Sequence, residues 1–396
     1  MRSGEISSLF IQRFDNGGEK MASTKEKGIA TIVRDSMSRR DFIKAVGLVA
    51  GAAGATLILP SCAQKPEPTK GPAALSTGMV DTSKYKKNPP WKVGRSGMGE
   101  VNSWQVIATL HFTYGIQTKY KGMFGDLFYA AAKFDPAKQV ADMEDILTHN
   151  IDVLFCQPVT GGNCVAQIEQ AMSKGIPVIL PGARAYTDKY VSYLDRDNAG
   201  VGRIYAEYIG QKIGGKGNVA IMMGLAGNTY AEDVLRGVRE GLAKFPKIKD
   251  IGLVYGAWSP VEGKKAMQGL LGKKVKIDGI INDGGNMGIG IVDAFLDAKL
   301  PVPPMCGDDG NGWLRKAKEN QVTFLAVQGG AEQYLDAVDT AVKTLKGEPV
   351  AKNVLADIIT FEEKDVDKYY RPDLNDQYWA INKLPEDLIV ATYKKK

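Results

Sequence analysis

The sequence predicts an α/β protein with two doubly wound parallel-sheet lobes. From Trp91 onward, short apolar runs alternate with amphipathic stretches, and repeated strand–helix units of this kind form parallel sheets covered by helices on both faces. The chain has 396 residues, which is enough for two lobes of ordinary domain size. Because the units are too many for one compact sheet, we expect two sheets.

Strands and helices are expected in alternation along this part of the chain. A helix is expected over residues 137–149, where four apolar residues recur on one helical face. The short apolar runs at residues 153–157 and 178–180 are typical of buried strands, and residues 167–174 between them of a helix. Further strands are expected at residues 219–223, 251–254, 279–281 and 324–327.

The turns that follow these strands are unusually polar or aromatic. In doubly wound sheets, ligands bind beyond the carboxyl ends of the strands. The candidate residues of a binding site are therefore those of the strand-to-helix turns. Such turns are expected at residues 102–104, 282–283, 307–311 and 328.

The N-terminal part carries an export signal. Arg39 and Arg40 precede Phe42 and Lys44, and an uncharged apolar run follows at residues 45–59. This run is shorter than the roughly 20 residues that span a bilayer, so it indicates the apolar region of a twin-arginine leader. We expect export from the bacterial cytoplasm by the twin-arginine machinery. The translation start is open between Met1, Met21 and Met37.

The end of the leader, residues 59–62, reads Leu-Pro-Ser-Cys and is similar to a lipobox. This predicts lipidation of Cys62 and a lipid anchor, and the alternative is that Cys62 is incidental and an ordinary peptidase cuts nearby. Residues 63–71 are rich in Lys, Pro, Glu and Thr, a composition typical of an extended tether. We expect a leader at residues 1–61 and a tether at residues 62–90.

Charge and cysteine content exclude other classes of protein. Residues 1–61 hold nine Lys/Arg and six Asp/Glu, which leaves 42 basic and 39 acidic residues; this balance argues against a nucleic-acid surface. The whole chain has two histidines, so a metal site is not expected. Cys156, Cys164 and Cys306 are interpreted as small core residues, and a Cys156–Cys164 disulfide is the alternative.

No enzyme motif accounts for the glycine-rich stretches. Residues 224–227 and 285–290 do not fit the dinucleotide pattern, and neither a phosphate loop nor a Gly-x-Ser-x-Gly elbow occurs. Two histidines supply a Ser/His/Asp triad poorly. Asp195 and Asp197 are interpreted as helix caps or hinge contacts. We therefore expect a protein without a cofactor that is not an enzyme.

From Val93 to about Asp365 the chain resembles the type I periplasmic sugar-binding proteins, the ribose-binding group that feeds ABC importers. The resemblance rests on ordered signals along some 250 residues. These are Asp197-Asn198 opening a helix, Arg236 with Gly241 after a glycine-rich turn, Gly-Asp-Asp-Gly at 307–310, Gln328 at a strand end and Leu-Lys-Gly-Glu at 345–348.

The resemblance implies a set of ligand-binding residues. An aromatic ring at such a position stacks on the C–H face of a sugar, and amides and carboxylates bind its hydroxyls. The implied positions are Asn102, Trp104, Arg236, Trp258, Asn282 or Asp283, Asp309 and Gln328.

Two positions depart from the ribose-binding pattern. Residues 181–183 read Pro-Gly-Ala where that group has an Asp-Arg pair, and Arg184 follows one position later. Gln105 stands where a second aromatic is common. Arg184 is therefore a further candidate ligand, ribose itself is doubtful, and a pentose, a hexose or a polyol all fit.

The resemblance also implies the lobes and the mechanism. The N-terminal lobe is expected at residues 91–196 plus 329–356 and the C-terminal lobe at residues 197–328 plus 357–396, with three hinge crossings between them. A monomer would close around a small-molecule sugar or polyol and present the closed form to an ABC permease. A ligand-sensing accessory protein for a membrane receptor and an exported enzyme are the alternatives.

Overall fold

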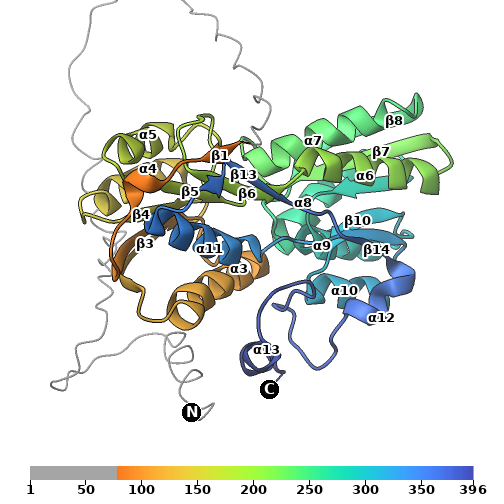
Figure 1. The fold of residues 1–396 in the computed structure, drawn as a ribbon. Coiled ribbons are helices and arrows are strands. Elements are labelled where there is room, and N and C mark those ends of the chain that lie inside the picture. The colour runs from red at the N-terminus through yellow and green to blue at the C-terminus, as the bar shows by residue number, and fades with distance from the viewer. Residues whose placement is uncertain (1–77, 396) are drawn as a thin grey trace, which may run out of the picture. The chain divides into compact units, whose positions relative to one another are not determined.

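A computed structural model describes residues 78–395 of the chain. The predicted leader, with Arg39, Arg40 and the lipidation site Cys62, lies outside the described residues. The described part forms two six-stranded sheets, each covered by helices on both faces (Figure 1). The predicted fold class, two doubly wound α/β lobes, is therefore confirmed.

The first sheet has the order β13-β6-β5-β4-β2-β3, and all its neighbours are parallel. Its helices lie between the strands in sequence, as the alternating pattern predicts. The strands are β2 (Trp91–Gly97), β3 (Phe124–Ala131), β4 (Val153–Cys156), β5 (Val178–Pro181), β6 (Ser192–Arg196) and β13 (Asn353–Ala356). The helices are α3 (Ser103–Tyr114), continued by the π-helical turn η2 (Gly115–Lys119), α4 (Pro136–Ile146), α5 (Val165–Ser173) and α11 (Gln333–Lys346).

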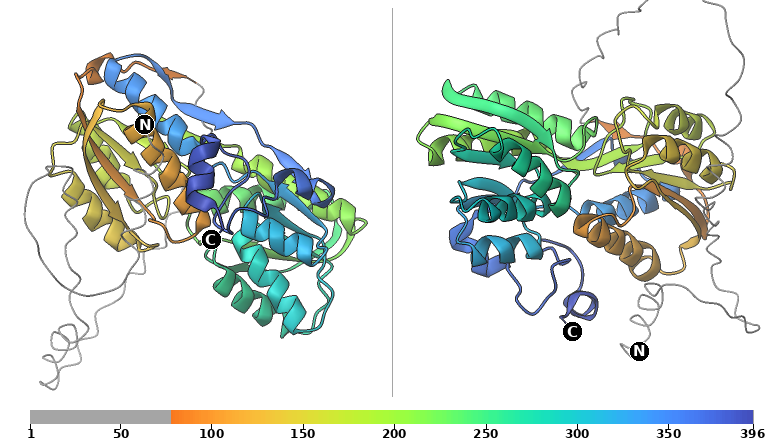
Figure 2. Two further views of the ribbon diagram at one scale, coloured as in Figure 1. Left: turned by 90° about the horizontal axis from the view of Figure 1, so that it is seen from below. Right: turned by 180° about the vertical axis from the view of Figure 1, so that it is seen from behind.

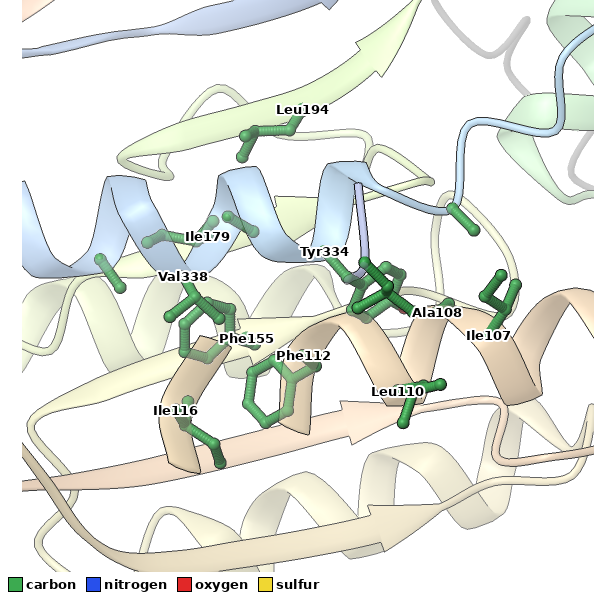
Figure 3. Close-up of a cluster of buried hydrophobic side chains, with 14 of the residues drawn as sticks. Ile107, Ala108, Leu110, Phe112, Ile116, Phe155, Ile179, Leu194, Tyr334 and Val338 are labelled. Atoms are coloured by element: carbon green, nitrogen blue, oxygen red, sulfur yellow. The ribbon is translucent and has the colours of Figure 1, made fainter. Parts of the chain in front are cut away.

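Alternation along the strands separates two cores on the faces of this sheet. Phe155 and Ile179 contact α3 and α11, whereas the neighbouring Leu154 and Val178 contact α4 and α5. Successive side chains of a strand point to opposite faces, so an uninterrupted apolar run serves both cores. Figure 3 shows the α3–α11 side, where Phe112, Phe155 and Val338 lie together.

The second sheet has the order β14-β11-β10-β9-β7-β8, with β14 antiparallel at the edge. Helices α6 and α7 cover one face, and α8, α9 and α10 cover the other (Figure 1). The strands are β7 (Lys216–Met223), β8 (Lys247–Tyr255), β9 (Gly279–Asn282), β10 (Met305–Asp308), β11 (Phe324–Val327) and β14 (Thr360–Glu362). The helices are α6 (Asn198–Lys212), α7 (Thr229–Leu242), α8 (Pro260–Leu271), α9 (Gly285–Asp297), α10 (Asn311–Glu319), η3 (Glu363–Asp365) and α12 (Val366–Tyr369).

The chain passes between the two sheets at three places. These are the junction of β6 with α6, the segment 328–332 between β11 and α11, and residues 357–359 between β13 and β14. The crossings join the two lobes in both views of Figure 2. Because each crossing follows the carboxyl end of a strand, the hinge lies beside the edge where binding residues are expected.

The last residues do not stay in the second lobe. Residues 371–395, which we call the C-terminal strap, include α13 (Glu386–Tyr393) and return to the first lobe (Figure 2). Their apolar side chains join the first-lobe core with Ile107 and Leu110 of α3. The assignment of residues 357–396 to the C-terminal lobe therefore does not hold for the strap residues whose apolar side chains pack in the first-lobe core. The strap residues in that core are Leu374, Tyr378, Trp379, Leu384, Ile389 and Tyr393.

The expected tether also ends earlier than residue 90. Strand β1 (Met79–Val80) pairs with β12 (Val350–Ala351) in an antiparallel ladder, and the short helix η1 (Ser83–Tyr85) buries Tyr85. These residues carry backbone and apolar contacts, so they belong to the folded lobe.

The three cysteines of the folded part are core residues. Cys156, Cys164 and Cys306 are fully buried and free, which confirms the interpretation as small core residues and excludes the Cys156–Cys164 disulfide. Burial raises the pKa of the Cys306 thiol well above its usual value. Among the described helices, none is long and apolar enough to cross a bilayer.

Candidate functional site

A pocket lies where the carboxyl ends of both sheets meet at the hinge. Its volume, measured as the space open to the centres of water molecules, is about 80 Å³. The first-lobe wall consists of Met98, Asn102, Trp104, Gln105, Gln157, Gly182 and Gln333. The second-lobe wall consists of Tyr205, Asn228, Tyr230, Trp258, Asp283, Gly284, Asn286 and Asp308. The hinge contributes Asp195, Arg196, Val327 and Gly329, and the strap contributes Trp379.

The first-lobe wall is built on the start of α3. Asn102 has extended backbone angles and accepts a hydrogen bond from the Gln105 N–H through Oδ1 at 3.0 Å, which is how an asparagine caps a helix. The cap leaves the Asn102 Nδ2 without a hydrogen bond within residues 78–395. Trp104 follows on the same turn, and its Nε1 donates to the Gly329 carbonyl at 2.8 Å. A ring and a free amide donor thus enter the pocket from one helix terminus.

Two glutamines complete this wall. The Gln105 Nε2 donates to the Gln157 Oε1 at 3.1 Å, and the Tyr334 hydroxyl donates to the same oxygen at 2.8 Å. Gln139 donates to the Gln157 backbone carbonyl at 2.8 Å. All four side chains are buried, so this polar network is held rigidly and carries no charge.

The second-lobe wall is built around Trp258. This residue and Ala257 both have left-handed backbone angles, with φ values of 48° and 49°, which persist in non-glycine residues only when the surroundings fix them. The ring lies against Gly224, where a Cβ would come within 1.8 Å of the indole. The Trp258 Nε1 donates to the Asp283 Oδ1 at 3.1 Å. A glycine and a carboxylate therefore fix the ring.

Arg196 enters the pocket from the end of β6. Its side chain is buried, and its Nη1 donates to the Gln328 carbonyl. The guanidinium carbon lies 5.7 Å from the centre of the Tyr230 ring, while the Nε has no partner among the described residues. A Cβ at Gly330, which has a φ of 75°, would lie 2.6 Å from the Arg196 Nη1. The arginine is thus a buried cation with an unused donor at the hinge.

Two carboxyl groups line the same pocket as this arginine. Burial raises the pKa of Asp283 to about 7 and that of Asp308 to about 6. Asp283 accepts from the Gly224 N–H at 3.1 Å, and Asp308 accepts from the backbone of Gly285 and Gly310. A carboxyl group has about four acceptor positions, so both keep capacity for hydroxyl groups.

Asp195 lies on the same strand as Arg196. It accepts hydrogen bonds from the Tyr193 hydroxyl at 2.7 Å, the Asn198 amide at 2.8 Å and the Arg196 N–H at 2.9 Å. Burial raises its pKa as well. These bonds fit the interpretation of Asp195 as a hinge contact, and the residue also lines the pocket.

Five of the eight residues predicted for the site lie elsewhere. Asn102, Trp104 and Trp258 line the pocket. Arg236 instead lies on the outer side of α7, with a side chain 46% exposed and paired to Asp233 at 3.0 Å. Consecutive residues of a helix point in different directions. Because Leu235 is buried against the lobe, the next residue, Arg236, points away from the sheet.

Arg184 is occupied by an ion pair. Its Nε and Nη2 donate to the two carboxylate oxygens of Asp233 at 3.0 and 2.9 Å, and both side chains are about one-tenth exposed. Because Arg184 follows β5 and Asp233 lies on α7, this pair joins the two lobes. The structure thus places Arg184 in an interlobe ion pair and not on the wall of the pocket.

The other three predicted residues lie one position or one layer behind the pocket. Asn282 is fully buried and donates to the Gly284 carbonyl at 3.0 Å, and its alternative, Asp283, is the residue that lines the pocket. Asp309 accepts from the Gly329 and Ile381 N–H groups, both at 2.6 Å.

Gln328 donates its side-chain amide to Glu332 rather than facing a ligand. In all three cases the strand or turn alternates direction at each residue. When the chain is aligned with the family's motif one residue out of register, the predicted side chain lies behind the pocket wall and not in the pocket.

Several pocket residues escaped sequence reasoning. Gln157 and Arg196 each stand at or just after a strand end, so the position rule for doubly wound sheets could have found them. Asp308 is the neighbour of a predicted residue. Trp379 had no signal, because it follows the last strand–helix unit. Within residues 78–395, no cluster of three or more His, Cys, Asp or Glu side chains is placed to hold a metal ion.

Comparisons with known proteins identify the family of the chain. The periplasmic binding protein domain family matches residues 114–349. The xylitol-binding protein of Mycolicibacterium smegmatis is 25% identical over 238 residues, which cover 60% of this chain and 68% of that protein. The ribose import binding protein of Escherichia coli is 27% identical over 263 residues, which cover 64% of this chain and 88% of that protein.

Solved structures share the fold. The fructose-binding periplasmic domain of a hybrid two-component system has a TM-score of 0.65 at 24% identity and covers 70% of this chain and 92% of its own. A solute-binding protein of an ABC transporter from Bacillus halodurans C-125, with bound myo-inositol, has a TM-score of 0.65 at 18% identity and covers 72% and 98%. Since the family match spans more than half of the chain, the protein belongs to the periplasmic binding protein domain family, as a type I member of the ribose-binding kind.

Proposed function

We propose that the protein is an extracytoplasmic solute-binding protein that captures one sugar or polyol between its lobes. The observation that carries this proposal is the pairing of Trp104 and Trp258 on opposite walls, with Arg196 at the hinge and two carboxyl groups on the second-lobe wall. Aromatic faces suit the C–H groups of a sugar, and the polar groups suit its hydroxyls.

The size of the pocket favours a small ligand. At about 80 Å³, the pocket holds several water molecules. That suits a monosaccharide or a polyol rather than an oligosaccharide. Relatives carry names that point to xylitol, ribose and D-allose, which supports the same class.

The polarity of the pocket favours a neutral ligand. Its buried cation, Arg196, faces carboxyl groups whose pKa values of about 6 and 7 leave them partly protonated near neutral pH. Such groups both accept from and donate to hydroxyls. An anionic ligand would be repelled by the carboxylates, and a cationic ligand would be repelled by the guanidinium.

Delivery to an ABC permease follows from the closed form. The interlobe pair of Arg184 with Asp233 and the proposed ligand contacts on both walls favour the closed form. A permease that binds the closed form therefore binds mainly the protein that carries a ligand. A ligand-sensing role beside a membrane receptor is the second candidate. It is favoured by the structural likeness to a fructose-binding domain of a hybrid two-component system.

Export and anchoring complete the proposal. The twin-arginine leader would bring the protein out of the cytoplasm, and lipidation of Cys62 would hold it at a membrane. Replacing Arg39 and Arg40 by Lys should leave precursor in the cytoplasm, and Cys62→Ala should release the protein from the membrane fraction or block its maturation. Undiminished export of the first variant, or a lipid-free mature N-terminus downstream of Cys62, contradicts these assignments.

A thermal-shift screen over sugars and polyols tests the binding function. A ligand that binds the folded state raises its stability by mass action, by about 2.7 kcal/mol at 100 times the Kd. We expect at least one pentose, hexose or polyol to raise the melting temperature, and calorimetric titration then gives the Kd. A screen in which none of these compounds shifts the transition would reject the proposed ligand class.

A further inference from the structure

The C-terminal strap lies outside the part of the chain that the family accounts for. The family match ends at residue 349, and the strap begins at residue 371. It nevertheless contacts both lobes and contributes Trp379 to the pocket.

The strap is attached to the second lobe through α10. The Asn311 Nδ2 donates to the carbonyls of Arg371, Leu374 and Asn375 at 2.9, 3.0 and 3.1 Å. Arg315 forms a bidentate pair with Asp376, with N–O distances of 3.0 and 2.8 Å. These contacts hold the first residues of the strap on the outside of α10.

The strap is attached to the first lobe through α3 and α11. The Lys383 N–H donates to the His111 Nε2 at 3.2 Å, and the Lys383 ammonium pairs with Asp336 at 2.7 Å. Burial lowers the pKa of His111 to about 4, so the ring is neutral. It donates from Nδ1 to the Ile107 carbonyl at 2.9 Å and keeps Nε2 as an acceptor.

Between these attachments Trp379 reaches the pocket, at a point where three parts of the molecule meet. Its Nε1 donates to the Ser103 Oγ at 3.1 Å, and this hydroxyl donates to the Asn286 Oδ1 at 3.2 Å. Ser103 opens α3 of the first lobe, and Asn286 lies on α9 of the second lobe. The indole also lies against the hinge, where a Cβ at Gly329 would come within 2.3 Å of the ring.

Asp309, which the resemblance implies as a ligand-binding residue, forms hydrogen bonds with the strap. The Asp309 Oδ2 accepts from the Ile381 N–H at 2.6 Å, and the Asp309 carbonyl accepts from the Ala380 N–H at 3.1 Å. The Oδ1 accepts from the Gly329 N–H at 2.6 Å. One buried side chain thus positions both the hinge and the residues that follow Trp379.

We propose that the C-terminal strap is a third wall of the binding pocket, in which Trp379 contacts the ligand and determines affinity and selectivity, and Asp309 positions it. The proposal rests on the proposed sugar- or polyol-binding function. The strap's indole faces a pocket whose other walls each present one tryptophan, Trp104 and Trp258. The ligand is therefore enclosed by three rings, one from each lobe and one from the strap.

The test compares Trp379→Phe and Trp379→Ala with Trp91→Phe in the full chain. Trp91 is a matched control because it is also a buried, hydrogen-bonded indole, with Nε1 donating to the Lys87 carbonyl at 3.1 Å, and it lies outside the pocket. With the best compound of the screen, Trp379→Ala should weaken binding about 10- to 100-fold and change the ranking of sugars and polyols. Trp91→Phe should lower the melting temperature and leave the Kd unchanged.

A double-mutant cycle tests the positioning role of Asp309. Asp309→Ala should change the ranking of ligands in the same direction as Trp379→Ala, and the double variant should lose less than the product of the two single losses, because both act through the same ring. Independent, multiplicative effects would contradict the assignment. An unchanged Kd and an unchanged ranking of ligands in a folded Trp379→Ala protein would overturn the proposal that the strap is a third wall of the pocket.

A ligand-free measurement separates this proposal from the proposed function. In hydrogen exchange, Trp379→Ala should reduce the protection of residues 329–334 and of the start of α3, because the indole contacts both, whereas Trp91→Phe should not. If no compound of the screen binds wild-type protein, the proposed function fails. This measurement then tests by itself whether the strap supports the hinge and the start of α3. Unchanged protection would then reject it.

Discussion

The two walls of the pocket differ in chemistry. The polar and aromatic side chains of the first-lobe wall are amides and one indole, and its buried Gln105–Gln157–Tyr334 network carries no charge. The second-lobe wall carries Asp283 and Asp308, whose pKa values burial raises to about 7 and about 6. One wall therefore keeps a fixed set of donors and acceptors, while the other changes its set with pH. The hinge residue Arg196 lies between them.

The largest expected effect concerns this arginine. Arg196→Met removes the buried cation between the walls and should weaken binding of the best sugar or polyol about 30- to 1000-fold, the equivalent of about 2–4 kcal/mol. Arg236→Ala is the control, because its side chain is 46% exposed on α7, and it should change the Kd less than about twofold. Calorimetric titration of both variants measures this. Equal losses would place the ligand elsewhere.

The indoles of the two walls come next. Trp104→Ala and Trp258→Ala should each weaken binding about 10- to 100-fold, since each removes an aromatic face from the pocket. Trp91→Ala should instead cost about 3–5 kcal/mol of unfolding free energy, as expected for a core tryptophan, without changing the Kd. Urea melts beside titrations separate binding from folding. A Trp104 or Trp258 variant that loses stability and keeps its affinity would identify that ring as core.

The charged wall predicts how stability depends on pH. The ordinary pKa of both carboxyl groups is 3.8, so between pH 4 and 7 the folded protein holds protons that the unfolded chain has released. Their contribution is present at low pH and is lost as the pH rises through about 6 to 7. These two groups should therefore lower the unfolding free energy of ligand-free protein by up to about 4 kcal/mol between pH 5 and 8, which is about 1.4 kcal/mol for each unit by which their folded-state pKa values exceed 5.

Asp283→Asn should flatten this profile, because an amide does not titrate. Buried Asp309 and Glu332, whose pKa values burial also raises to about 7, should leave part of the slope. Urea melts at several pH values give the profile. A slope of equal size in wild type and variant would show that Asp283 is ionised in the folded protein.

The smallest expected effect concerns closure without a ligand contact. Arg184→Ala removes the bidentate pair with Asp233 that joins the lobes, and it should weaken binding about 3- to 10-fold by destabilising the closed form. Lys189→Ala is the control, because it removes an exposed pair with Glu169 inside one lobe and should change little. A loss as large as that of Arg196→Met would mean that Arg184 reaches the ligand.

The fold was predictable because it depends on patterns longer than one residue. Runs such as residues 153–157 and 324–327 are strands within one residue of their predicted ends, since apolar periodicity tolerates local error. The pocket depends on single positions. Asp308 faces the ligand site and Asp309 faces the strap, and no periodicity distinguishes two adjacent carboxylates at a strand end.

Two other features lay beyond sequence reasoning for different reasons. Arg196 stands directly before the Asp-Asn motif that opens α6, and no local sequence pattern distinguishes a hinge residue from a pocket residue at this point. Trp379 belongs to a segment without strand–helix units, and its position depends on long-range contacts with Ser103 and Gly329. Such contacts between distant parts of the chain leave no local pattern.

The burial of the three cysteines has a practical consequence. Because Cys156, Cys164 and Cys306 are fully buried, a chain with Cys62 replaced should resist thiol-reactive dyes. A single cysteine introduced at Tyr186, which is 47% exposed and hydrogen-bonds Glu232 across the lobes, would then carry the only label. Its fluorescence should change when the lobes open or close, because the surroundings of the dye change at this interlobe contact, which would turn the protein into an optical reporter for its own ligand.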